Sequence, residues 1–137
     1  MGCDIHCHFE IKVYGEWHHY SQPKVDRWYQ LFGKLAGVRD ESQKPIAPVR
    51  GLPKDVSFTT KFDSDHWGID GHTRSWITSK EFVKLWKWIE KEKGRFNLEL
   101  YEEWDFLFGN GFGDFYEYPE SYPKDLEDFR LVFWFDN

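Results

Sequence analysis

Four polar side chains occupy alternate positions near the start of the chain: Asp4, His6, His8 and Glu10. Alternate residues of a β-strand project from the same face, at steps of about 6.5–7 Å. Imidazoles and carboxylates gathered on one face can exchange protons or bind a metal ion. We therefore expect this face to form the floor of a functional site, although a polar strand edge exposed to solvent would give the same pattern.

The pair His6-x-His8 also suits a metal centre, because it presents two imidazoles on the same side of a strand. Catalytic zinc commonly takes three protein ligands and leaves its fourth position to water. The candidates for the remaining ligand are Asp4, Asp70, His66 and His72. A divalent metal such as zinc is therefore one interpretation of this face, and metal-free proton transfer is the other.

A second group of chemically useful residues lies in the segment IDGHTRSW, residues 69–76. Asp70 begins the DGH turn, in which a glycine permits a sharp bend before His72. Arg74 and Ser75 are hydrogen-bond donors suited to a phosphate. The alternative interpretation is a structured loop that only caps the helix that follows.

These two segments could cooperate if His72 faces His6 across a cleft. Two imidazoles in that arrangement can act as general acid and general base without a metal. Asp4 or Glu10 would then orient one of the histidines, as carboxylates commonly do. We therefore expect His6, His72, Asp4 and Glu10 to form the catalytic set.

Three arginines are candidates for holding a phosphate: Arg27, Arg39 and Arg50. A guanidinium group matches the geometry of phosphate oxygens and binds them with two parallel hydrogen bonds. Trp67 and Trp76 offer flat faces on which a nucleobase could stack. The competing interpretations are surface salt bridges for the arginines and core packing for most of the aromatic residues.

The elements that position these residues follow from the hydrophobic pattern. Strict alternation over residues 3–14 predicts a half-buried strand, and residues 16–21 can return as the second strand of a hairpin. Asp26 can N-cap a helix over residues 27–36, with apolar side chains at helical spacing. Gly37 is the expected C-cap.

The remaining chain predicts fewer regular elements. Residues 38–77 are rich in Pro, Gly, Ser and Asp and indicate a long loop, which in a small domain is often functional. A capping box at residues 78–81 starts a helix over about 79–93. A further helix is expected over about 97–104, and residues 116–128 resemble a surface loop. The aromatic and β-branched run at 129–136 predicts a central final strand beside the first one.

Length and charge limit the classes of protein. At 137 residues the chain fits one domain, and its elements predict an α+β fold over residues 1–137. The expected sheet is small, antiparallel or mixed, and built from the N-terminal hairpin and the C-terminal strand, with two to three helices and a long functional loop. The net charge of −6 and the lack of a basic run argue against binding a nucleic-acid polymer, whereas a local arginine cluster can still hold a small anion.

Cysteine usage and hydropathy indicate a compartment. Cys3 and Cys7 lie four residues apart on one predicted strand, about 13 Å, which is too far for a disulfide. We expect both to be buried thiols in a reducing compartment. No segment approaches the roughly 18 apolar residues of a membrane helix, and the N-terminus lacks a signal-peptide pattern. A cytoplasmic protein without a membrane partner is expected.

Several motifs together resemble, from end to end, an uncharacterised family of small bacteriophage and bacterial proteins. The motifs are MGCDIH (1–6) with Glu10, Trp17, RWYQLF (27–32), LAGVR (35–39), RGLP (50–53), DGHTRSW (70–76) and LVFWFDN (131–137). The resemblance places these candidate site residues on shared motifs: Asp4, His6, Glu10, Arg27, Arg39, Arg50, Asp70, His72, Ser75 and Trp76. It leaves His8 outside them, which favours a site of His6, His72 and arginines over a metal-binding histidine pair.

These observations lead to a functional hypothesis. We expect a small enzyme of phosphodiesterase type that hydrolyses a phosphate-bearing nucleotide or nucleotide-like signal. The family's setting implies a counter-defence protein that acts on such a signal in the host cytoplasm. The alternatives are a binder that sequesters a nucleotide signal without converting it, and a structural or protein-interaction module.

Overall fold

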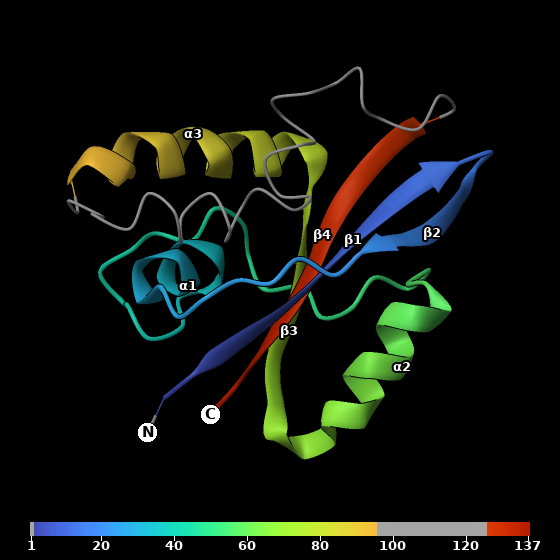
Figure 1. Cartoon of the computed structure of the whole chain (residues 1–137), viewed down its shortest axis with the longest axis horizontal. Helices are drawn as coiled ribbons and strands as arrows, with labels where there is room; N and C mark the ends of the chain where they lie inside the picture. Colours follow the sequence, from blue (N-terminus) through green and yellow to red (C-terminus); the bar gives the residue numbers. More distant parts are fainter. Residues whose placement is uncertain (1, 96–125) are drawn as a thin grey trace.

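The computed structural model of the chain describes residues 2–95 and 126–137, with the backbone alone for residues 93–95 (Figure 1). Four strands form one antiparallel sheet: β1 (Asp4–Val13), β2 (Glu16–Ser21), β3 (Gly71–Thr78) and β4 (Leu126–Asp136). The helices are α1 (Tyr29–Ala36), α2 (Phe58–Trp67), the short 3₁₀ helix η1 (Gly68–Asp70) and α3 (Ser79–Arg95). The protein therefore has an α+β fold, as the sequence predicts.

The strand order is β2-β1-β4-β3, which puts β1 and β4 in the centre of the sheet. The central position of β4 beside β1 agrees with the sequence, since β4 carries the dense aromatic run. The hairpin of β1 and β2 also forms as expected, with its turn at Tyr14 and Gly15, which both have positive φ. Register between the central strands places Asp4 opposite Asp136, His6 opposite Trp134 and Glu10 opposite Arg130.

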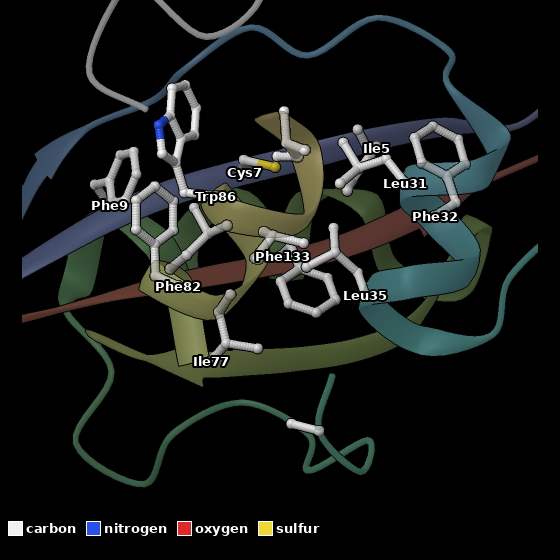
Figure 2. Close-up of a cluster of buried hydrophobic side chains, with 14 of the residues drawn as sticks. Ile5, Cys7, Phe9, Leu31, Phe32, Leu35, Ile77, Phe82, Trp86 and Phe133 are labelled. Atoms are coloured by element: carbon white, nitrogen blue, oxygen red, sulfur yellow. The ribbon is translucent and has the colours of Figure 1, made fainter. Parts of the chain in front are cut away.

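One face of the sheet carries the hydrophobic core, covered by α1 and α3 (Figure 2). The odd-numbered residues of β1, such as Cys7 and Phe9, point into it together with Phe133 of β4. Helix α1 contributes Leu31, Phe32 and Leu35, and α3 contributes Phe82, Leu85, Trp86 and Ile89, all of them buried. Apolar side chains at positions i, i+3, i+4 and i+7 of each helix account for this packing.

The other face of the sheet carries polar side chains around the buried Val132 and Trp134 and is covered by α2, which lies apart from α1 and α3 (Figure 1). Helix α2 reverses the usual pattern, because its buried residues are Thr60 and Ser64, whereas Phe58 and Phe62 are 81% and 67% exposed. Hydrogen bonds rather than apolar contacts therefore hold most of this layer together.

The prediction of a long loop over residues 38–77 is wrong for the second half of this segment. That half folds into α2, η1 and most of β3. Two features conceal these elements in the sequence: α2 has no apolar inner stripe, and β3 pairs with β4 through an irregularity between His72 and Ser75. One extra residue in β3 breaks the alternation by which a strand is recognised.

The helix ends compare with the sequence in different ways. Helix α1 begins at Tyr29 after Trp28, not after Asp26, and no side chain caps it. Gly37 is confirmed as its C-cap in the left-handed region, at φ 72°. The capping box before α3 is also confirmed, with Thr78 and Glu81 exchanging hydrogen bonds between side chain and backbone N–H. The expected helix at 97–104 and residues 116–125 lie outside the described residues.

None of the helices within residues 2–95, the part of the described chain that contains them, has the length and hydropathy that crossing a bilayer requires.

Candidate functional site

A pocket opens along an unpaired edge of β1. Strand β1 pairs with β4 over its whole length but with β2 only from Phe9 onward. Beside the unpaired half lies a pocket of about 700 Å³, bounded by residues 4–7 of β1 and by residues 22–27, which follow β2. This volume falls within the range of about 300–1,000 Å³ that small-molecule sites occupy.

His6 lines this pocket and is held by a carboxylate and an aromatic ring. Its Nε2 lies 2.5 Å from Oδ2 of Asp136, at the end of the neighbouring strand. The indole of Trp67, the last residue of α2, lies against the imidazole with ring centroids 4.2 Å apart. A carboxylate accepts only, so Nε2 carries the proton and Nδ1 of the neutral ring keeps its lone pair. Among the described residues Nδ1 has no hydrogen-bond partner, which leaves it available as a base.

Charged side chains surround the mouth of the pocket. Arg27 donates two hydrogen bonds to the carboxylate of Asp4, at 2.7 and 3.2 Å. These hydrogen bonds lower the pKa of Asp4 below its usual value and raise the pKa of Arg27. Lys24 and Asp26 lie on the same rim. Since both partners of the Arg27–Asp4 pair are about half exposed, the pair can open without a large loss of stability.

A row of three polar side chains, the histidine chain, runs behind the pocket from α2 to β2. Asp63 accepts from Nε2 of His8 at 2.7 Å, and Nδ1 of His8 lies 2.9 Å from Nε2 of His19. Burial lowers the pKa of His8 and of His19, so both imidazoles favour the neutral form. The two imidazoles expected as a metal-binding pair, His6 and His8, are thus bonded to different carboxylates, Asp136 and Asp63.

Glu10 has a structural position rather than the orienting one that we expected. The side chain is fully buried and its Oε1 forms an ion pair with Arg130 of β4, at 2.8 Å. Its Oε2 accepts hydrogen bonds from the backbone N–H of Ser57 and the hydroxyl of Thr60, at 2.9 and 2.8 Å. Glu10 therefore anchors the first turn of α2 to the sheet and contacts neither His6 nor His72.

The expected meeting of His72 with His6 is not what the structure shows. His72 pairs with Phe135, and its ring stacks on that phenylalanine on the side of the sheet that carries the core. His6 stands on the α2 side of the same sheet. Both lie at the same end of the sheet, but the sheet itself separates them, so they do not line one cleft.

The other predicted residues are mostly engaged in structural contacts. Arg50 forms a two-bond ion pair with Glu81 at 2.7 and 2.6 Å and lies over the ring of Trp76. Ser75 is buried and accepts from the backbone N–H of Arg50. Asp70 is exposed at the end of η1. Of the three arginines expected to bind phosphate, Arg50 is therefore committed elsewhere.

The remaining arginine and the cysteines lie at the core side of the sheet end. Arg39 donates to Oδ1 of Asn137 at 3.4 Å, and its guanidinium lies 5.6 Å from the ring centre of Tyr29. Cys3 and Cys7 are free, buried thiols, as expected, and burial raises the pKa of each.

Within residues 2–95 and 126–137, no three His, Cys, Asp or Glu side chains gather in an arrangement that could hold a metal ion.

Sequence reasoning missed three residues that the fold brings to the candidate site. Asp136, Asp63 and His19 supply the partners of His6 and His8, from three different elements. The strand pattern alone could have indicated His19, because it occupies an alternate position of the second strand. The positions of Asp136 and Asp63 depend on strand register and on a helix that the pattern does not reveal.

Comparison with family models, with curated proteins and with solved structures finds no match to this chain. The geometry of the described residues is therefore the basis for assigning a function.

Proposed function

We propose that the protein is a small hydrolase of phosphodiesterase type that acts on a phosphate-bearing nucleotide or nucleotide-like ligand in the pocket beside β1, with His6 as its general base. The observation that carries this proposal is His6, which lines a pocket of ligand size and whose imidazole is hydrogen-bonded to the carboxylate of Asp136. A carboxylate on one ring nitrogen fixes the tautomer and leaves the other nitrogen basic, which is the arrangement that general-base catalysis needs.

The charges at the pocket mouth support a phosphate as the group that is bound. Arg27 and Lys24 lie on the rim, and Arg27 can exchange its exposed partner Asp4 for a phosphate oxygen. Because the overall charge of the protein is −6, most of its surface repels an anion. A local pair of cations therefore favours anion binding at this position.

In the proposed reaction, Nδ1 of His6 takes a proton from water as the water oxygen attacks phosphorus. The bond from phosphorus to the leaving oxygen breaks, and the His6 imidazolium returns the proton to that oxygen. Asp136 stabilises the imidazolium in between, while Arg27 neutralises charge on the phosphate oxygens. General acid–base catalysis of this kind contributes about 10²–10⁴-fold to the rate.

The experiment is incubation of the protein with a panel of phosphodiesters, including cyclic dinucleotides, ADP-ribose and bis(4-nitrophenyl) phosphate, followed by chromatography. We expect conversion that falls about 10²–10⁴-fold in His6→Ala, with ligand binding retained. Asp136→Asn should lower conversion less than His6→Ala does. The matched control is His18→Ala, since His18 is an exposed histidine of β2 outside the pocket.

A non-catalytic binder is the second candidate, because the pocket holds a single imidazole among its lining residues in the described chain. Such a protein would return its ligand unchanged after heat denaturation, and His6→Ala would then reduce only affinity. A panel in which no compound is converted and none raises the melting temperature would overturn both candidates.

A further inference from the structure

We propose that Arg39 and His72 form a binding site for a small oxyanion such as phosphate, on the core side of the sheet end and distinct from the His6 pocket. A side-chain oxygen of the protein itself, Oδ1 of Asn137, stands where an oxygen of the anion would bind. Arg39 Nη2 lies 3.4 Å from this oxygen, and His72 Nε2 lies 3.2 Å from it.

The donor and acceptor roles follow from the chemistry of these three groups. A guanidinium can only donate, so the atom of Asn137 that faces it must be the amide oxygen. That oxygen can only accept, so His72 must donate to it from a protonated Nε2. Two N–H groups from separate parts of the chain therefore converge on one acceptor, which is the arrangement that binds an oxyanion.

The ring of His72 is fixed so that Nε2 points outward. Its Nδ1 lies 2.9 Å from Oγ1 of Thr73, whose hydroxyl can donate to it. The ring also stacks on Phe135, with centroids 6.1 Å apart and planes at 28°. Arg39 is supported in turn by Tyr29, since its guanidinium lies over that ring. Both donors are thus held in place by groups that are not themselves ligands.

Backbone strain lies at one donor, Arg39, and at Thr73, the residue next to the other donor, His72. Arg39 has φ of 64° and Thr73 has φ of 55°, values that residues other than glycine seldom adopt and that are most unusual for a β-branched side chain. Within the described residues, the third non-glycine residue with positive φ is Tyr14, in the hairpin turn, where the conformation has an evident structural reason. Strain of this kind concentrates at ligand clamps and active sites.

The contacts of Asn137 are weak enough for an anion to replace them. Both hydrogen bonds are long, and Arg39 and Asn137 are exposed. A phosphate oxygen carries charge and makes shorter, stronger hydrogen bonds with the same donors. Two neighbouring carboxylates are engaged elsewhere, Asp40 by Ser42 and Asp136 by His6.

Titration of the isotope-labelled protein with inorganic phosphate, followed by the NMR signals of the His72 ring, tests this site. We expect saturable shifts at His72. Asn137→Gly should bind phosphate several-fold more tightly, because it removes the competing oxygen. Asn137→Asp should bind at least tenfold more weakly, because its carboxylate is a charged competitor on the same donors.

Arg39→Gly is the decisive variant, since glycine adopts the left-handed conformation without strain and the backbone can keep its path. It should fold normally and lose the saturable response. Lys61→Gln is the matched control, because Lys61 is an exposed cation on α2, and it should leave the response unchanged. A response at His72 that stays linear with phosphate, or that is equal in wild type, Asn137→Asp and Arg39→Gly, would overturn the proposal.

Discussion

Replacement of Glu10 by alanine is the strongest test of how α2 is held to the sheet. Removing one partner of a buried ion pair costs about 3–5 kcal/mol, because the remaining charge is left without compensation. Arg130 keeps a second partner in Asp55, at 2.8 Å, but Asp55 is largely exposed and compensates poorly. The N–H of Ser57 and the hydroxyl of Thr60 also lose their acceptor, at a cost of about 1 kcal/mol each if they stay dry. These losses follow from removal of the same carboxylate and overlap with the cost of breaking the pair, so we expect Glu10→Ala to lose about 3–5 kcal/mol of unfolding free energy.

Calorimetry and guanidinium unfolding measure this loss directly. For a chain of this size, about 4 °C of melting temperature corresponds to 1 kcal/mol, so the expected decrease is about 12–20 °C. Glu16→Ala is the matched control, since Glu16 is an exposed carboxylate of the adjacent strand and should change stability by about 0.5 kcal/mol or less. Hydrogen exchange adds a local measurement, because the amides of α2 should lose protection before those of β1 and β4.

Two outcomes would refute this reasoning. A loss below about 1 kcal/mol would mean that the buried pair contributes little beyond its desolvation cost. A gain in stability would mean that the carboxylate is kept for chemistry at the expense of the fold, as happens at active sites. Either result would remove the stabilising role assigned to Glu10.

Three further outcomes are expected. Burial lowers the pKa of His8 and of His19 from the usual 6.5. Below about pH 6.5 the unfolded chain therefore binds more protons than the folded protein does. Guanidinium unfolding should show the free energy of unfolding falling as the pH is lowered from about 7.5 to 5.5. Gly33→Ala should lose about 1–3 kcal/mol of unfolding free energy in thermal unfolding, because the alanine Cβ would collide with the backbone oxygen of Asp40. The loss is expected even though alanine usually favours a helix. Alanine at Phe58 and Phe62 together should change the unfolding free energy by about 0.5 kcal/mol or less per site, since both rings are exposed.

The sequence predicts the core side of this fold well because apolar periodicity determines it. Alternation in β1 and helical spacing in α1 and α3 each identify a face that must be buried, and among the helices described here α1 and α3 supply the matching apolar stripes. The aromatic run of β4 indicates a central strand for the same reason. Burial of apolar surface is a local property of a segment, so a single segment reveals it.

The polar side of the sheet could not be predicted in the same way. The interactions that position α2 join residues far apart in the chain, such as Glu10 with Thr60 and His8 with Asp63. A helix that turns threonine and serine inward and phenylalanine outward has no signal in a hydrophobic pattern. The strand pattern therefore identified His6 and His8 as site residues but could not show that each already has its own carboxylate.

Partner choice also decides which candidate residues remain available. Three arginines share the same chemistry in the sequence, yet Arg50 is bound to Glu81, Arg27 holds an exposed aspartate, and Arg39 has only weak contacts. The difference lies in strand register and in the path of the loops, which the residue types do not encode. Availability rather than residue type therefore separates a binding arginine from a structural one.

Access to His6 depends on how firmly α2 is held, because Trp67 at the end of that helix covers its ring. Glu10 accepts a hydrogen bond at the start of the helix. At its end, Arg74 donates hydrogen bonds to Ser64 Oγ and to the carbonyl oxygens of Ser64, Gly68 and Gly71. Neither clamp lines the pocket, so each can change the position of Trp67 without touching a ligand. A helix held by polar contacts at its two ends, with two phenylalanines facing solvent and no buried apolar residue, is expected to open at a lower free energy than the central strands.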